Sequence, residues 1–170
     1  MRKLIPVFAI SVLGISCAKQ QAHPPVGGFF SEKEMNDSQN RAKNLNETER
    51  LQIQDWIKNQ DENFYSMKMN YWVNIPDLDK NAKKQDGDEI SYQYEIYDFD
   101  MVKFYEEPKI ERQVHFGQFN EIRAVEDALR YMKENQEVTL LIPSVLAFGI
   151  YGDNDKISGD MPIIIKLKTL

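Results

Sequence analysis

The sequence is poor in the residues that most often mark disulfide, metal and nucleotide sites. Cys17 is its sole cysteine, and His23 and His115 are its two histidines. One cysteine cannot form an internal disulfide, and two distant histidines do not give the ligand spacing of a zinc site. Glycine-rich phosphate-binding motifs and the GxSxG nucleophile motif are also missing.

One acidic loop, Asp153-Asn154-Asp155, comes closest to a calcium motif. An EF-hand loop also needs a glycine at its sixth position and a glutamate at its twelfth, and this loop has neither at that spacing. We therefore expect no metal and no cofactor.

Basic clusters are missing as well. The chain has 21 Lys and Arg against 27 Asp and Glu, for a net charge of −6. Binding to nucleic acid needs basic patches that contact phosphates, so we expect no nucleic-acid partner. Hydrophobic residues make up 42% of the chain, which is enough for a core. A length of 170 residues favours one domain with a terminal extension.

The first sixteen residues have the pattern of a signal peptide. Arg2 and Lys3 precede an apolar run from Leu4 to Ile15, which is too short for a stable membrane-spanning helix. The segment Leu13 to Cys17 resembles a bacterial lipobox, although its leucine lies four residues before the cysteine instead of three. An ordinary secretory signal followed by a chance cysteine is the alternative.

We favour lipidation of Cys17, because no second cysteine exists to form a disulfide with it. The lipid would then anchor the protein to a membrane. The residues directly after Cys17 (Ala-Lys-Gln-Gln) lack an acidic cluster. By analogy with other lipoproteins, this indicates the cell envelope, on the periplasmic face of the outer membrane.

Composition divides the remaining chain into two parts. Residues 17–44 are rich in Asn, Gln, Ser, Pro and Gly without apolar periodicity, which predicts a flexible tether with at most a short helical piece after Ser31. Residues 45–170 form the predicted domain. It opens with a short helix over residues 47–59, where capping residues precede an apolar stripe.

Alternating apolar residues predict strands over residues 64–75, 90–96, 101–105, 110–116, 138–142 and 163–170. One helix is predicted after Asn120, because the apolar residues Ile122, Val125, Leu129 and Met132 fall on one helical face. Asn135 suits a left-handed stop after it. The expected fold class is α+β, with an antiparallel sheet wrapped around one amphipathic helix.

The segment between the last two strands is the most informative. It is roughly twenty residues long, which is unusual for a loop inside a compact domain. It is also too apolar for a disordered linker, since it holds Leu146, Phe148, Ile150, Tyr151 and Ile157. We interpret residues 143–162 as a flap over a pocket.

This part of the chain resembles the FK506-binding-protein (FKBP) family of peptidyl-prolyl cis–trans isomerases. The resemblance rests on Ile142-Pro143-Ser144-Val145-Leu146-Ala147-Phe148-Gly149, then Gly152, Ile157 and a C-terminal apolar strand. It covers roughly residues 85–170. Two positions depart from the usual pattern, because Phe148 stands where tyrosine is usual and Ser158-Gly159 where Pro-Pro is usual.

The resemblance implies the fold above and an apolar pocket that binds a proline-containing segment. The residues it places at the pocket are Tyr94, Phe104, Ile122, Val125, Phe148, Ile157 and Ile165. Val125 stands where a larger residue is usual, Phe148 lacks a hydroxyl, and Tyr105 and Glu121 are unusual for their positions. These departures imply a shallower pocket with fewer hydrogen-bond donors.

Two functions that use this pocket remain open at this point, beside a third hypothesis of a structural lipoprotein with no cleft, which Phe148 and Ile157 buried in a closed core would favour. One is a prolyl isomerase that helps envelope proteins fold, acting on their proline-containing segments. The other is a non-catalytic adaptor that uses the same cleft to hold a partner peptide. The whole chain looks similar to the gliding-motility-associated FKBP-like lipoproteins of Bacteroidetes, and that likeness implies service to a motility or secretion apparatus.

Overall fold

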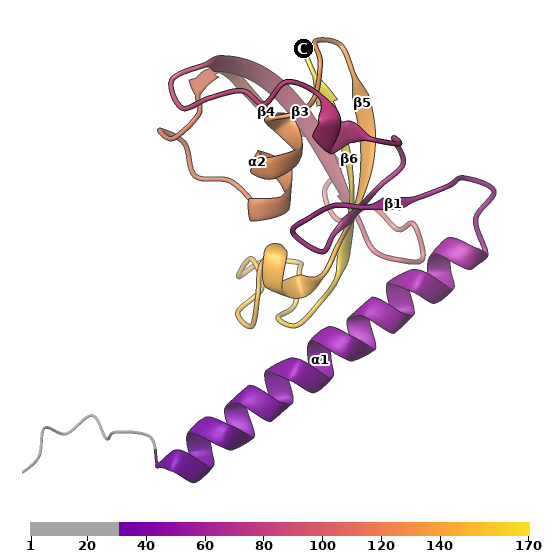
Figure 1. Ribbon diagram of the computed structural model, residues 1–170, viewed down its shortest axis with the longest axis vertical. Helices are drawn as coiled ribbons and strands as arrows, with labels where there is room; N and C mark the ends of the chain where they lie inside the picture. Colours follow the sequence, from indigo (N-terminus) through magenta and orange to yellow (C-terminus); the bar gives the residue numbers. More distant parts are fainter. Residues whose placement is uncertain (1–30) are drawn as a thin grey trace, which may run out of the picture.

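A six-stranded antiparallel sheet, in the order β1-β2-β5-β6-β3-β4, organises the structure (Figure 1). The computed structural model describes residues 31–170. The predicted signal peptide, Cys17 and the first part of the predicted tether lie outside the described residues. The strands are β1 Tyr65–Ser66, β2 Trp72–Val73, β3 Glu89–Tyr97, β4 Lys109–His115, β5 Glu137–Ile142 and β6 Ile163–Thr169.

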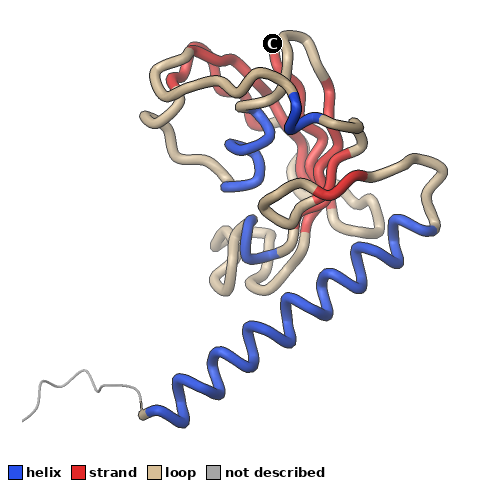
Figure 2. The backbone as a smooth tube through the Cα atoms, viewed as in Figure 1, coloured by secondary structure: helices blue, strands red, loops and turns tan. Residues whose placement is uncertain are grey.

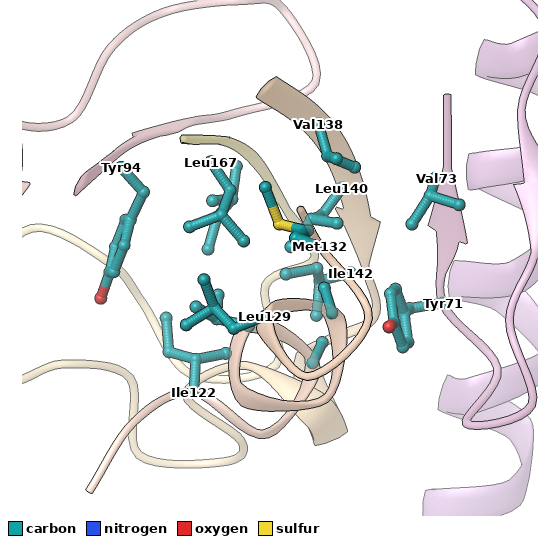
Figure 3. Packing of buried hydrophobic residues seen from close by; sticks show 14 of the residues in the cluster. Tyr71, Val73, Tyr94, Ile122, Leu129, Met132, Val138, Leu140, Ile142 and Leu167 are labelled. Atoms are coloured by element: carbon teal, nitrogen blue, oxygen red, sulfur yellow. The ribbon is translucent and has the colours of Figure 1, made fainter. Parts of the chain in front are cut away.

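The helix α2 (Arg123–Leu129) packs against one face of this sheet and forms the main core with it (Figure 3). Its predicted apolar stripe is buried, as are the inward residues of β3, where burial alternates along the strand. The expected α+β architecture is therefore confirmed. The helix begins at Arg123 with Ile122 as its N-cap residue, so Asn120 lies too early to cap it, and no side chain caps this helix.

The helix α1 (Glu32–Lys58) packs against the opposite face (Figures 1 and 2). Ile53 is fully buried there against Trp72, Leu141 and Ile164. The Trp56 Nε1–H donates to the Phe99 carbonyl over 2.9 Å. The sheet is thus covered on both faces.

The predicted helix over residues 47–59 was too short, and the predicted tether is wrong over residues 32–44. The helix α1 has 27 residues and begins at a capping box, in which Ser31 and Glu34 satisfy each other's backbone N–H groups. Its first half lacks an apolar stripe because it projects into solvent, so periodicity gave no signal. The sequence signal that could have revealed the whole helix was the absence of Gly and Pro from residue 32 to residue 58.

Two predicted strands were also wrong. Residues 64–75 form a tight hairpin, because Asn70 adopts a positive φ of 64° and the chain reverses between Met67 and Tyr71. Residues 101–105 form no strand, since the Asp98 carboxylate accepts the N–H groups of Asp100 and Val102 and holds the chain in a turn. Within residues 31–170, no helix is long and apolar enough to cross a bilayer.

Candidate active site

An open pocket of about 890 Å³ lies where β3, the start of α2 and the flap meet. Its wall has four contributors: Tyr94 to Ile96 from β3, residues 105–109 before and at β4, residues 120–123 at α2, and Ala147, Phe148, Asp153 and Lys156 from the flap. These segments are far apart in the sequence. The sheet register and the packing of α2 bring them together.

The seven residues predicted for the site occupy two layers. Tyr94, Ile122 and Phe148 line the pocket. Phe104 is half-buried against the main core, and Val125, Ile157 and Ile165 are buried within that core, so none of these four lies on the pocket wall. The structure therefore brings three of the seven to the pocket and leaves the others as its support. Figure 3 shows Tyr94 and Ile122 at one side of the core.

The resemblance marked Glu121 only as unusual for its position and gave it no role, yet its buried carboxylate collects most of the hydrogen bonds described for the pocket wall. Its side chain is 1% exposed. Oε1 accepts the Tyr94 hydroxyl at 2.9 Å and the Ile122 N–H at 2.8 Å. Oε2 accepts the Tyr92 hydroxyl at 2.7 Å and the Lys109 ammonium at 2.8 Å. Four donors therefore satisfy one buried carboxylate.

The same surroundings raise the pKa of both tyrosine hydroxyls that donate to Glu121. Burial raises the pKa of Tyr92 and Tyr94, and the neighbouring Glu121 carboxylate raises both further. Their rings stack with centroids 6.3 Å apart and planes 3° from parallel. Lys109 lies 5.5 Å from the Tyr94 ring centroid and balances the charge of Glu121. Both hydroxyls therefore remain protonated and point at the carboxylate.

The flap is held by backbone hydrogen bonds around Phe148. The Ser144 carbonyl accepts the N–H groups of Ala147 at 2.9 Å and Gly149 at 2.8 Å. The Gly149 carbonyl then accepts the Asp160 N–H at 2.8 Å. Phe148 thus lies between two residues fixed by their backbones, and its ring contacts the main core.

Asp153 organises the outer part of the flap. Its Oδ1 accepts the N–H groups of Asp155 at 3.0 Å and Ile157 at 2.9 Å, and its Oδ2 accepts the Tyr105 hydroxyl. Burial alone would raise the pKa of Asp153, but the bonds from Tyr105 and the two N–H groups outweigh it and lower that pKa below its ordinary value. Lys156 lies over the Tyr105 ring, 5.0 Å from its centroid. Tyr105 thereby joins the flap to the segment before β4.

The chemistry of the pocket follows from these groups. Among the residues described, its wall contains no serine, threonine, cysteine or histidine that a base could activate. Within residues 31–170, no group of three His, Cys, Asp or Glu side chains is placed to hold a metal ion. The pocket offers the aromatic and aliphatic surface of Tyr94, Ile96, Ile122 and Phe148 beside the Glu121 carboxylate, which pairs with Lys109, and charged side chains make up about half of its lining residues.

Comparisons with known proteins agree with this geometry. Residues 80–169 match the FKBP-type peptidyl-prolyl cis-trans isomerase family. No curated protein sequence matches the chain. Among solved structures, the fold resembles a peptidyl-prolyl cis-trans isomerase from Pseudomonas syringae pv. tomato, with a TM-score of 0.52 and 18% identity over 75% of this chain and 92% of that chain.

The fold is also similar to FkpA from Escherichia coli, with a TM-score of 0.53 and 16% identity over 82% of this chain and 72% of that one. The N-terminal domain of FKBP42 from Arabidopsis thaliana gives a TM-score of 0.50 and 12% identity, over 65% and 91% of the two chains. At these identities the structures show the fold, whereas the family match covers more than half of the 170 residues. The chain therefore belongs to the family of FKBP-type peptidyl-prolyl cis-trans isomerases.

Proposed function

We propose that this protein isomerises prolyl peptide bonds in proteins of the cell envelope as they fold. The observation that carries the proposal is the convergence of Tyr94, Ile122 and Phe148 on one open pocket. Rotation about an X–Pro bond breaks amide resonance and meets a barrier of roughly 18–20 kcal/mol. Uncatalysed exchange takes tens to hundreds of seconds, which is slow enough to limit folding.

Catalysis of this rotation needs no nucleophile and no general base. A pocket that binds the twisted amide more tightly than the planar one lowers the barrier. The twisted amide has a less polarised carbonyl, so an aromatic surface shielded from water suits it. Phe148 would provide such a surface from the flap once a bound peptide covers it, and Ile122 and Ile96 would provide an apolar wall for the prolyl ring. Each tenfold gain in rate requires about 1.4 kcal/mol of such differential binding.

Removing the Phe148 ring tests this function. We expect Phe148→Ala to lower kcat/KM for a prolyl peptide by roughly ten- to a hundredfold, because the flap then loses its contact with the prolyl segment. The matched control is Tyr151→Ala, since Tyr151 lies in the same loop but is 81% exposed and off the pocket wall. Equal rates for the two variants, or a wild-type rate no higher than background, would contradict the proposal.

A second use of the pocket is binding without turnover, as an adaptor for proline-containing partner peptides. The observation that favours it is that Glu121 already engages the Tyr94 hydroxyl and the Ile122 N–H, so these donors are occupied inside the pocket. Phe148 adds no hydroxyl. Titration of a proline-containing peptide, followed by NMR, separates the two uses: binding without acceleration supports the adaptor.

Placement in the envelope is part of the proposal. A signal peptide over residues 1–16 and lipidation of Cys17 would anchor the protein to a membrane, on the periplasmic face of the outer membrane, and the likeness to motility-associated lipoproteins supports a role with a motility or secretion apparatus. Mass spectrometry of the mature N terminus, in wild type and Cys17→Ala, tests the anchor. A wild-type N terminus without acyl chains would exclude it.

A further inference from the structure

A buried carboxylate on α1 reaches Ser144, near the start of the flap. Glu49 is 2% exposed, although it lies on a helix whose neighbouring residues are mostly in solvent. Its Oε2 accepts the Ser144 N–H at 2.7 Å, and its Oε1 accepts the Ser144 hydroxyl at 2.6 Å. Within residues 31–170, no lysine, arginine or histidine forms an ion pair with it. Both hydrogen bonds to the Glu49 carboxylate therefore come from one residue, Ser144, through its backbone N–H and its hydroxyl.

The hydrogen bonds continue from Ser144 to Phe148. The Ser144 carbonyl accepts the N–H groups of Ala147 and Gly149, the two neighbours of Phe148 in the sequence. Glu49 thus holds the N–H and the hydroxyl of Ser144, and the carbonyl of Ser144 holds the backbone on both sides of Phe148. A shift of Ser144 would be passed to the backbone on both sides of the Phe148 ring.

A second contact joins α1 to Asp160, near the other end of the flap. Arg41 pairs with Asp160 at 2.7 Å, and the Asp160 N–H donates to the Gly149 carbonyl. The Arg41 side chain is 76% exposed, and ion pairs in such positions contribute little. Glu49 is the stronger of the two connections, because a buried carboxylate that loses its donors is left without water to replace them.

The attachment of α1 to the sheet does not need Glu49. Ile53, Trp56 and their partners already form an apolar contact on that face of the sheet. Burying a carboxylate without a cation is a poor way to add stability, since the cost of desolvation offsets most of the gain. The two bonds from Glu49 are directional and end on the flap, which is the property needed for positioning.

We propose that Glu49 is a positioning residue for the isomerase site, and that through it α1 sets the conformation of the flap that presents Phe148. The inference rests on the proposed isomerase function for its kinetic consequence. It also extends the working unit beyond residues 80–169, to a helix that ends before this segment begins. A movement of α1 would therefore alter catalysis through the position of Phe148, although α1 itself contributes no residue to the pocket wall.

The test compares Glu49→Gln and Ser144→Ala with the matched control Ile53→Val in the full chain. Gln keeps the size of Glu49 but has a single acceptor oxygen and no charge, so it cannot accept from both the Ser144 N–H and the Ser144 hydroxyl, and the bond that it keeps is no longer charge-assisted. Ile53→Val weakens the packing of the same helix and touches no flap residue. At a temperature where all variants are folded, we expect kcat/KM to fall at least about tenfold for Glu49→Gln and to stay within about twofold for Ile53→Val.

NMR resonances of the Ala147 and Gly149 amides give a readout that does not depend on turnover. We expect them to shift in Glu49→Gln and Ser144→Ala and to stay in place in Ile53→Val. The double variant should lose no more activity than Glu49→Gln alone, because both changes break one connection. If Glu49→Gln does not fold, the amide shifts of Ser144→Ala provide the test, since this variant keeps the bond from the residue 144 N–H to Glu49.

Unmoved flap amides in Glu49→Gln, or in Ser144→Ala where it decides, would overturn the inference, as would losses of activity that simply follow the losses of thermal stability across all variants. A wild type without turnover would contradict the proposed function but would leave the amide comparison to decide the positioning role. Moved amides together with a selective loss of kcat/KM would support both.

Discussion

At the scale of single residues, two glutamates decide how this pocket is built. Glu121 is buried at the pocket wall and takes up two hydroxyls, one ammonium and one backbone N–H. Glu49 is buried behind the flap and takes up only the two donors of Ser144. Glu121 stabilises the pocket wall and has the Lys109 ammonium beside it, whereas Glu49 aligns the flap and forms no ion pair within the described residues. Burial alone does not distinguish the two roles, whereas their partners do.

We expect Glu121→Ala to destabilise the protein by about 1–3 kcal/mol, because buried hydroxyls of Tyr92 and Tyr94 would lose their acceptor. The free energy of unfolding in urea measures the loss. Glu106→Ala is the control, since Glu106 also lines the pocket but is exposed. A loss in Glu121→Ala no greater than that of the control would show that the hydroxyls find other partners.

At the scale of elements, the flap is a folded unit rather than an open loop. Its chain crosses itself so closely that a Cβ on Gly152 would lie 2.1 Å from the Ile157 carbonyl oxygen, and one on Gly159 equally close to the Ile150 carbonyl oxygen. Gly152 also has a φ of 69°. The Asp153 carboxylate closes the same region by accepting two backbone N–H groups. This close packing explains the need for glycine at positions 152 and 159, whereas Ile150 and Tyr151 on the same segment remain exposed.

We expect Gly152→Ala to disrupt the flap and to lower stability by more than about 2 kcal/mol, since it adds a backbone clash to the strain of a positive φ. Thermal unfolding and the peptide isomerisation rate measure the two effects. Gly87→Ala isolates the strain, because Gly87 has a φ of 93° but open space around it. Similar losses in both variants would mean that the flap adapts to the added methyl group.

At the scale of the whole molecule, one sheet carries two helices with different tasks. The main core between the sheet and α2 supports the pocket, and the smaller cluster around Ile53 attaches α1 to the other face. The alternation of β5 and β6 makes this possible, since Leu140 and Ile165 face the main core while Leu141 and Ile164 face α1. Both faces of the sheet are therefore apolar where the helices lie.

We expect Ile53→Ala to cost about 2–5 kcal/mol, the range for truncating a fully buried isoleucine. Because α1 and the sheet share one cluster, circular dichroism and tryptophan fluorescence should still report a single unfolding transition. The exposed Leu51→Ala on the same helix is the control and should cost much less. Separate transitions for helix and sheet would show that α1 is an independent unit.

Local sequence patterns determined the elements with clear apolar periodicity. The alternation of β3 and the stripe of α2 appear in short stretches because each buries one side against the main core, and the final strand appears as an apolar run because it is buried on both faces. The class of fold followed from these patterns, and the resemblance carried by the flap motif implied the family and three residues that line the pocket. The start of α1 and the turns after Met67 and Asp98 did not, because capping and side-chain-to-backbone bonds decided them.

Only the tertiary structure decided the polar connections of the site. Glu49 and Ser144 are 95 residues apart in the sequence, and Tyr94, which donates to Glu121, lies 27 residues before it on β3. A glutamate has no local signature for burial, because its position inside the protein depends on donors that distant segments bring to it. The sequence alone thus indicated three residues of the pocket wall, namely Tyr94, Ile122 and Phe148. The packing of sheet, helices and flap decided which charged groups lie inside it and what they hold.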